Sequence, residues 1–309
     1  MRVPIRQPRN SSRRRNHMSR IRPTRIFAPA LVTLGAIVAL GALVAPAGAL
    51  DGAIFNVVEH RDIDYVASED YAENKDKLDL FMPEGLTNAP VVVYFHGGGL
   101  QNGTKAIGEG LGRQLASRGI GLVSANYRLS PSVMHPAHIE DATAAFAWAK
   151  RNIASYGGDA DRVFVSGHSA GAYLAALMAL DPRYLDAHNL RLSDIRGAIP
   201  ISPFLFVEDH DIAPSRPKTV WGTDEAVWLD ASVTPYIGAD KPPMLFIYAD
   251  GDDDWRREQN QRLAAELSDA GNDAAVIEIA DRTHGSVNSN MGDDLDTGMM
   301  KVVSFVEAH

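Results

Sequence analysis

One serine lies in a setting suited to nucleophilic chemistry. Residues 167–171 read Gly-His-Ser-Ala-Gly, directly after the apolar run 163–165 and directly before a helix-forming stretch, 172–180. Glycines two residues on either side of Ser169 leave room for a chain that turns abruptly from a strand into a helix, and such a turn holds the hydroxyl exposed in a strained conformation. We therefore predict that Ser169 is a nucleophile able to attack a carbonyl carbon.

A second glycine-rich segment has the character of an anion-stabilising loop. His-Gly-Gly-Gly at residues 96–99 follows the apolar run 91–95, so a bare backbone leaves a strand end and its N–H groups can approach a ligand closely. Such donors stabilise the oxyanion that forms when a hydroxyl adds to an acyl carbon. We expect Gly98, Gly99 and the amide of Ala170 to form this oxyanion hole. A glycine-rich turn without a catalytic duty is the alternative.

Among the ten histidines, His284 has the position expected of a general base for that serine. It follows the apolar stretch 275–279 on a loop at the carboxyl end of a predicted strand, where catalytic groups gather in parallel sheets. The other histidines lie in the basic N-terminal region, before the core, in the two glycine motifs, before the penultimate strand or at the last position. We expect His284 to accept the proton of Ser169.

Four aspartates within residues 250–254 offer the carboxylate that would orient this histidine. They follow the apolar run 244–249, which predicts a strand end. A carboxylate there holds the imidazole in the required tautomer and stabilises the imidazolium without taking its proton. We favour Asp252 as the third member of a catalytic triad, with Asp253 as the alternative. The remaining acids are expected to form a solvated turn that caps the next helix.

The alternation of apolar runs with helix-period stretches indicates which elements position these groups. This alternation is typical of βα units that build a parallel sheet. Several runs are apolar at successive positions, as strands covered on both faces must be. The expected strands are residues 78–82, 91–95, 120–125, 162–166, 195–201, 244–249 and 275–279, and the expected helices are residues 109–118, 136–155, 170–180, 255–270 and 295–307.

One long segment, residues 202–242, has no regular pattern. It is rich in proline and acidic residues and carries the aromatic residues Phe204, Phe206, Trp221, Trp228 and Tyr236. A loop of this length inside a compact domain is usually functional. Two interpretations stay open: a small lid or wall of a substrate cleft, and an excursion whose aromatic residues simply pack on the body.

Composition narrows the classes of function. The chain has 309 residues, of which 45% are apolar and 22% charged, a balance typical of one globular domain with a large core. The net charge is −9, although the first 25 residues contain nine arginines and no acid, so the rest is strongly acidic and unsuited to nucleic acid. The absence of cysteine excludes disulfides, a thiolate nucleophile and a Cys-ligated metal.

The N-terminal region has the pattern of an export signal. An uncharged apolar run, residues 26–44, follows the arginines and precedes Ala47-Gly48-Ala49. We expect residues 1–49 to be a signal peptide cleaved after Ala49, or after Ala47. Residues 50–309 would then be one catalytic domain, periplasmic or secreted, without stable membrane association. An uncleaved anchor is the alternative, because the run is just long enough to span a bilayer, and the export route stays open.

Together these motifs resemble the α/β-hydrolase superfamily, and within it bacterial carboxylesterases related to hormone-sensitive lipase, feruloyl-esterase-like enzymes and kynurenine formamidases. The order serine, aspartate, histidine along the chain is the α/β-hydrolase order. The resemblance includes Asn-Tyr-Arg-Leu-Ser-Pro at 126–131, Tyr-Gly-Gly-Asp at 156–159 and Arg-Thr-His at 282–284, and it covers essentially all of the chain after the N-terminal region. It implies an α/β fold with a mostly parallel eight-stranded sheet flanked by helices.

The resemblance also implies hydrolysis of small-molecule esters with short acyl or aryl groups, through an acyl-enzyme and without metal or organic cofactor. It implies that Tyr127, Arg128 and Asp141 support the site structurally. Leu100 stands where many relatives place an aromatic residue, so acyl chain length stays open, as do the natural substrate and the oligomeric state. Two other functions stay open: an amidase of the arylformamidase type, and a non-catalytic binding protein of this fold.

Overall fold

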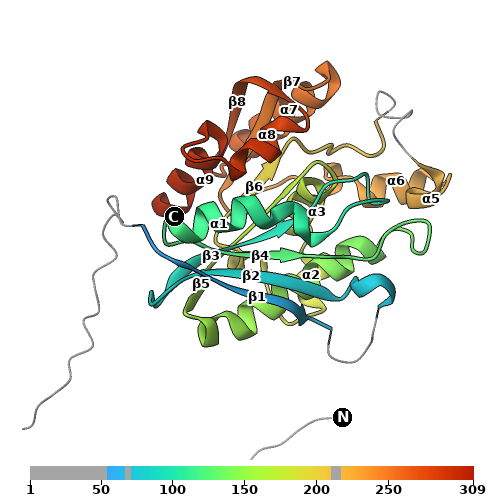
Figure 1. Ribbon diagram of the computed structural model, residues 1–309. Coiled ribbons are helices and arrows are strands. Elements are labelled where there is room, and N and C mark those ends of the chain that lie inside the picture. The colour runs from blue at the N-terminus through green and yellow to red at the C-terminus, as the bar shows by residue number, and fades with distance from the viewer. Residues whose placement is uncertain (1–53, 67–70, 210–216) are drawn as a thin grey trace, which may run out of the picture. The chain divides into compact units, whose positions relative to one another are not determined.

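One eight-stranded sheet organises the chain (Figure 1). The computed structural model describes residues 54–66, 71–209 and 217–309, and the predicted signal peptide, residues 1–49, lies outside the described residues. The strands are β1 Val57–Asp64, β2 Lys77–Pro83, β3 Ala89–Phe95, β4 Gly121–Ala125, β5 Gly158–His168, β6 Ala198–Ile201, β7 Met244–Gly251 and β8 Ala274–Thr283. Their spatial order is β1-β2-β4-β3-β5-β6-β7-β8, with β2 antiparallel to both neighbours and all other pairs parallel. This confirms the predicted mostly parallel eight-stranded sheet.

Helices connect the parallel strands and cover both faces of the sheet. They are α1 Glu109–Ser117, α2 Ala137–Asn152, α3 Ala170–Leu180, α4 Pro182–Asp186, α5 Lys218–Trp221, α6 Glu225–Ala231, α7 Asp254–Asp269, α8 Ser286–Ser289 and α9 Thr297–Ala308. Figure 1 shows α1 and α2 on opposite sides of the central strands. None of the helices within the described ranges combines the length and apolar character that crossing a membrane requires.

Strand β3 illustrates why the central strands are apolar at every position. All seven of its residues are buried. Val91, Val93 and Phe95 belong to the core cluster that includes α2 and α3, whereas Val92 and Tyr94 belong to the cluster that includes α1 and α9. Alternate side chains of a strand point to opposite faces, so a strand covered on both sides is apolar throughout. Polar chemistry is therefore confined to the strand ends.

Parallel register brings those ends to one edge of the sheet. Phe95 of β3 pairs with Gly167 of β5, and His168 pairs with Ile201 of β6. Because neighbouring parallel strands end together, the residues that follow them meet at the same edge. The residues that follow β3, β5, β6, β7 and β8 are His96, Ser169, Ser202, Asp252 and His284.

The irregular segment 202–242 carries α5 and α6, and several of its aromatic residues are buried. The ring centroid of Phe204 lies 4.7 Å from that of Tyr173 in α3 and 5.5 Å from that of Trp221. The Tyr173 hydroxyl donates to the carbonyl of Ala231, at the end of α6, over 2.7 Å. Helix α3, which begins at the residue after Ser169, thus supports this segment. Its part in covering a substrate stays a prediction.

Strand β1 was not predicted from the sequence. Its residues, Val-Val-Glu-His-Arg-Asp-Ile-Asp, include no long apolar run, and all eight are partly or fully exposed. It pairs with β2 at the edge of the sheet, and none of its residues is buried. An edge strand of this kind needs few apolar residues, and charged side chains protect it from further pairing.

Candidate active site

Ser169 lies between β5 and α3 in the strained backbone conformation that the glycine motif predicts. Its φ of 53° and ψ of −115° are rare for a residue with a side chain. Position 171 requires glycine because a Cβ there would lie 2.0 Å from the carbonyl oxygen of Phe95. The Ser169 amide donates to the carbonyl of Ile201 over 2.8 Å. The ends of β3 and β6 therefore fix the turn that presents the hydroxyl.

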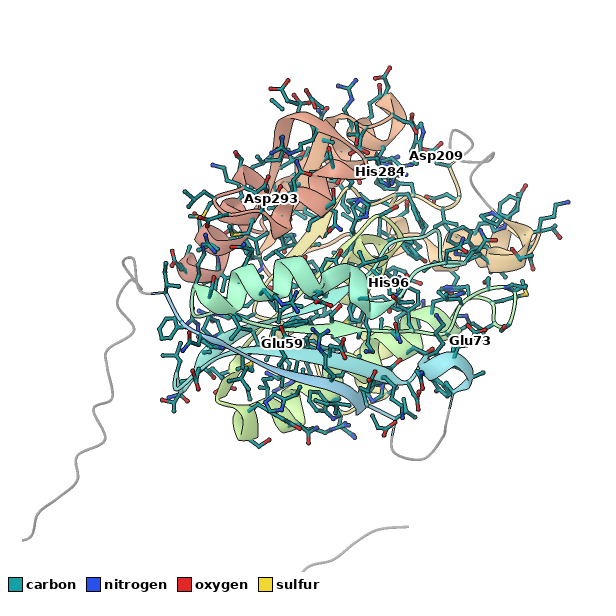
Figure 2. The ribbon with its side chains drawn as sticks, viewed as in Figure 1. Glu59, Glu73, His96, Asp209, His284 and Asp293 are labelled. Carbon is teal, nitrogen blue, oxygen red and sulfur yellow. The ribbon has the colours of Figure 1, made fainter. Side chains whose placement is uncertain are left out.

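His284, labelled in Figure 2, joins the hydroxyl of Ser169 to the carboxylate of Asp252 through its two ring nitrogens. Its Nε2 lies 3.0 Å from Ser169 Oγ, and its Nδ1 lies 2.6 Å from Asp252 Oδ1. The imidazole is 38% exposed, whereas the Asp252 side chain is fully buried. The structure thus brings the three predicted residues into one hydrogen-bonded chain. One imidazole nitrogen is placed to take the hydroxyl proton while the other donates to the carboxylate.

Asp252 is a buried carboxylate with several partners. Its Oδ2 accepts from the hydroxyl of Ser202 over 2.6 Å and from the amide of Ala249 over 3.0 Å, and Nε of Arg256 lies 3.7 Å from Oδ1. Burial raises the pKa of Asp252, but the hydrogen bonds from its three donors, including His284, lower it by more, so the pKa lies below the ordinary value of 3.8. The carboxylate is therefore ionised at neutral pH.

The neighbouring acids do different work. Asp253, the alternative considered from the sequence, is exposed and lies at the N-cap position of α7. Its side chain accepts no hydrogen bond from a helix amide in the part of the chain described, so the side-chain cap expected of the remaining acids does not form at Asp253. Asp250 instead accepts from the amides of Asp281 and Arg282, both over 2.9 Å. These bonds join the end of β7 to the last residues of β8, directly before the histidine loop, residues 284–285 between β8 and α8.

The glycine-rich loop after β3 approaches the serine closely. A Cβ on Gly97 would lie 3.3 Å from the Cβ of Ser169. Gly98 and Gly99 have φ values of 118° and 64°, a region that favours glycine. Within the described ranges, no protein atom accepts a hydrogen bond from the amides of Gly98, Gly99 or Ala170. The predicted oxyanion donors therefore have no competing acceptor.

Tyr127 supports this loop, and the next residue, Arg128, pairs with Asp141 of α2. The Tyr127 hydroxyl donates to the carbonyl of His96 over 2.7 Å, and the two rings stack with centroids 4.4 Å apart. Arg128 donates to both carboxylate oxygens of Asp141, over 2.6 to 3.1 Å. Burial lowers the pKa of His96 to about 4, so this ring is neutral and acts as packing for the loop.

Two further hydrogen bonds near the site have no signal in a sequence motif. Ser202 binds the carboxylate of Asp252, and the Tyr94 hydroxyl donates to Oδ1 of Asn288 over 2.7 Å, which joins β3 to α8. The one signal that could have found Ser202 is its place directly after an apolar strand. No group of three or more His, Asp or Glu side chains is placed to hold a metal ion in residues 54–66, 71–209 and 217–309.

Comparison with known proteins gives the family. A family model described as alpha/beta hydrolase fold matches residues 92–288, a range that contains both glycine motifs, Asp252 and His284. The chain belongs to the α/β-hydrolase family. This α/β hydrolase has the mostly parallel eight-stranded sheet that the sequence resemblance implied, so that resemblance is confirmed.

The curated relatives of this α/β hydrolase include esterases. Esterase LipQ of Mycobacterium tuberculosis is 32% identical over 213 residues, which cover 62% of this chain and 48% of the relative. Carboxylesterase NlhH of the same species is 43% identical over 93 residues, covering 30% of this chain and 29% of the relative. The chain thus matches about half or less of the length of these relatives.

Solved structures with the same fold are also named as esterases. A truncated carbohydrate esterase from gut microbiota superposes with a TM-score of 0.71 at 18% identity, covering 83% of this chain and 97% of that chain. A propionate-bound esterase from Thermogutta terrifontis superposes with a TM-score of 0.64 at 25% identity, covering 83% of this chain and 94% of that chain. The likeness extends over nearly the whole described domain.

Proposed function

We propose that this α/β hydrolase is a carboxylesterase that cleaves small esters with short acyl or aryl groups through an acyl-enzyme. The observation that carries the proposal is the hydrogen-bonded chain Ser169, His284 and Asp252, next to loop amides for which residues 54–66, 71–209 and 217–309 provide no acceptor. The names of the relatives support the same reaction class.

Acylation follows from the contacts of His284. Ser169 Oγ attacks the acyl carbon while Nε2 of His284 takes the hydroxyl proton. The electron pair of the carbonyl moves onto its oxygen, which receives hydrogen bonds from the amides of the oxyanion hole, Gly98, Gly99 and Ala170. Expulsion of the alcohol breaks the ester C–O bond, and the leaving oxygen takes the proton from Nε2. The serine ester remains.

Deacylation repeats the sequence with water. His284 Nε2 removes a proton from the water that attacks the acyl carbon, and the same amides bind the second oxyanion. Collapse breaks the bond to Ser169 Oγ, which takes back its proton, and the carboxylic acid leaves. Throughout both halves the ionised Asp252 stabilises the imidazolium and keeps a proton on Nδ1.

The test is the substitution Ser169→Ala. Turnover of p-nitrophenyl acetate and butyrate should fall by at least about 10³-fold, because the nucleophile is lost. Covalent labelling by a fluorophosphonate should disappear, while the thermal unfolding midpoint stays within a few degrees. Ser166→Ala, three residues earlier in β5, is the matched control and should keep both activities. Labelling that persists in the Ser169→Ala variant would overturn the assignment.

Substrate scope is measured on the same preparation. Rates across p-nitrophenyl esters of increasing acyl length should be highest for the short chains. An aryl formamide assayed beside them separates the carboxylesterase from an amidase of the formamidase type, which would prefer the formamide. Inertness toward all these substrates would instead favour a binding protein of this fold.

The proposal includes export of the enzyme to the periplasm or the medium. It is supported by the basic and apolar pattern of residues 1–49 and by the small residues at 47–49. N-terminal sequencing of the mature protein should begin at Leu50, or at Gly48 if cleavage follows Ala47. A chain that keeps its first residues and partitions with membranes would contradict this part.

A further inference from the structure

His168, the residue directly before Ser169, makes a hydrogen bond to the backbone of the histidine loop. It is the last residue of β5 and only 9% exposed. Its Nε2 lies 2.7 Å from the carbonyl oxygen of His284. A carbonyl oxygen only accepts, so Nε2 of His168 carries a proton and donates it. One strand end therefore presents Ser169 and, through the adjacent side chain, restrains the backbone of His284.

The opposite side of the same ring faces the glycine-rich loop. A Cβ built on Gly97 would lie 2.9 Å from Nδ1 of His168, closer than a real Cβ approaches. The imidazole of His168 thus lies between the loop that carries Gly98 and Gly99 and the loop that carries His284. The size of the ring and its Nε2–H bond to the His284 carbonyl together fix the distance between these two loops.

The ring is also neutral where the base must become charged. Burial first, and then positive charge on His284 and Arg256, lower the pKa of His168 to about 4, although the hydrogen bond to the His284 carbonyl and the charge of Asp252 act in the opposite direction. The centroids of the two imidazoles lie 4.8 Å apart. A charged ring at this distance would oppose the imidazolium of His284, whereas a neutral donor does not.

We propose that His168 is a positioning residue for His284. Through its Nε2–H it fixes the backbone of the base and so the 3.0 Å approach of Nε2 of His284 to Ser169 Oγ. It acts through His284 and touches neither the acyl group nor the leaving alcohol. The inference rests on the proposed function, because it assigns a supporting residue to that reaction.

Other restraints on the residues around His284 do not involve its carbonyl: Thr283 pairs with Gly251 of β7, and the ring of His284 bonds Asp252. Asp250 holds the amides of Asp281 and Arg282, and Asn288 binds the Tyr94 hydroxyl. We expect these contacts to keep the loop in place when His168 is changed. The carbonyl oxygen of His284 would then lose the hydrogen bond from His168 Nε2. Loss of the donor should therefore affect the rate of the reaction more than the integrity of the fold.

The experiment compares His168→Leu with His168→Gln. Leucine removes the donor, whereas the glutamine amide nitrogen can replace the imidazole Nε2–H. We expect His168→Leu to lower kcat on p-nitrophenyl butyrate about 10- to 100-fold with KM within about twofold, since misplacement of a catalytic group mainly affects the chemical step. His168→Gln should recover most of this loss. Fluorophosphonate labelling of Ser169 should slow in parallel.

His138→Leu is the matched control. His138 of α2 is a buried histidine, 1% exposed, with a pKa likewise lowered to about 4 by burial and with Nε2 3.1 Å from the Ser130 hydroxyl. It makes no contact with the triad among the residues described. Its substitution should lower the unfolding midpoint as much as His168→Leu does, without lowering kcat.

The outcomes separate this inference from the proposed function. A wild-type chain that neither labels nor turns over esters refutes the function. An active wild type with full kcat in His168→Leu, or with equal losses in the Leu and Gln variants, refutes the positioning role.

If His168→Leu does not fold, ¹⁵N imidazole NMR of the wild type decides. A neutral His168 with its proton on Nε2 from pH 5 to 9 supports the inference, and an Nδ1–H tautomer or titration near pH 6.5 overturns it.

Discussion

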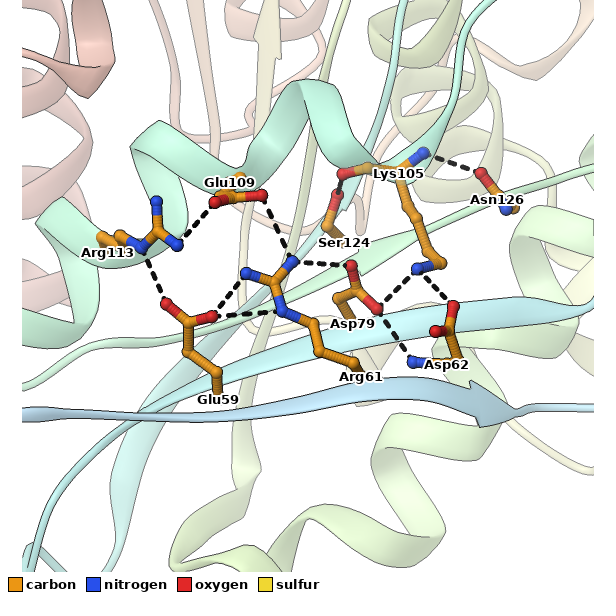
Figure 3. Close-up of polar contacts among 9 residues, drawn as sticks. All are labelled: Glu59, Arg61, Asp62, Asp79, Lys105, Glu109, Arg113, Ser124 and Asn126. Carbon is orange, nitrogen blue, oxygen red and sulfur yellow. Dashed lines mark hydrogen bonds and ion pairs between the residues drawn. The ribbon is translucent and has the colours of Figure 1, made fainter. Parts of the chain in front are cut away.

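The active site and the β1–β2 edge of the sheet both hold carboxylates against nitrogen donors, but in different surroundings. At the edge, an ionic network joins β1, β2 and α1 (Figure 3). It is formed by Glu59, Arg61, Asp62, Asp79, Lys105, Glu109 and Arg113. At the site, a single carboxylate, Asp252, accepts a hydrogen bond from the imidazole of His284. The two regions show how burial changes what the same contacts contribute.

Most members of the edge network are open to water. The side chains of Glu59, Arg61 and Arg113 are 28%, 33% and 51% exposed. Arg61 contacts three carboxylates, and Lys105 contacts Asp62 as well as Asp79. A charge lost from such a network leaves its partners with other charges or with water, so each exposed pair contributes little.

The buried carboxylate of the site has no such substitutes. The side chain of Asp252 has no exposed surface, and each of its hydrogen bonds aims at a particular donor. We expect Asp252 to contribute mainly to the orientation of His284, and little to the free energy of unfolding. Substitutions at the site should therefore reduce the rate with small changes in stability, and substitutions at the edge should do the reverse.

The largest expected effect comes from Asp252→Asn. The amide cannot stabilise the imidazolium and favours the wrong tautomer of His284, so kcat should fall about 10³- to 10⁴-fold. Turnover of p-nitrophenyl butyrate measures the loss, and circular dichroism checks the fold. Asp253→Asn is the matched control and should stay within about twofold of the wild type, because that exposed side chain does not contact His284. Equal losses in the two variants would break the comparison.

A smaller effect is expected from Ser202→Ala, which removes one hydrogen bond to the same carboxylate. The carboxylate keeps its bonds to Ala249 and His284, so His284 should be misplaced only slightly, and we expect a loss in kcat of about 10-fold. Ser166→Ala removes a buried hydroxyl that donates to the neutral carbonyl of Ile199, and it should leave kcat unchanged. A Ser202→Ala variant with wild-type kcat would show that Asp252 does not depend on this donor.

The same variant makes a prediction about acid unfolding. Because the folded pKa of Asp252 lies below the ordinary value of 3.8, its ionisation contributes stability that is present above pH 3.8 and is lost as pH falls through the folded pKa. Without Ser202 the folded pKa rises toward 3.8, so part of that stability disappears at neutral pH. Acid unfolding, followed by tryptophan fluorescence, should then begin at a higher pH than in the wild type and in Ser166→Ala.

The contrast between the regions also explains what the sequence could reveal. Ser169 and His284 were predictable because each follows an apolar run, and parallel register brings the ends of such runs together. Asp252 could be favoured but not separated from Asp253 by spacing, since the deciding property is burial. Only the fold determines which of two adjacent acids faces inward.

Other parts gave no local signal. Strand β1 has an irregular pattern because its position depends on pairing with β2 and on ion pairs such as Arg61–Asp79, which join residues distant in sequence. Ser202 belongs to no motif, and its role arises where the end of β6 lies beside β7. Contacts between chain segments, rather than residue type, define both features.

At the edge, Asp79→Asn should lower stability and leave catalysis intact. The Asp79 side chain is 3% exposed and accepts from Arg61 over 2.9 Å, from Lys105 over 2.6 Å and from the amide of Asp62 over 2.9 Å. Burial raises its pKa, but these bonds lower it by more. We expect a loss of about 1 to 3 kcal/mol in the free energy of unfolding, measured in urea, with kcat within about twofold. A large fall in kcat would mean that the edge communicates with the site.

The smallest effect is expected from Arg113→Ala, which tests whether exposure alone separates the members of the edge network. Arg113 is 51% exposed and pairs with Glu59 over 2.7 Å and Glu109 over 2.5 Å. Its loss should cost at most about 1 kcal/mol at low salt. In 1 M NaCl, where the Debye length falls to about 3 Å, this cost should nearly vanish, whereas the cost of Asp79→Asn should largely remain, because a buried carboxylate is poorly screened. Equal salt dependence of the two variants would contradict the role assigned to burial.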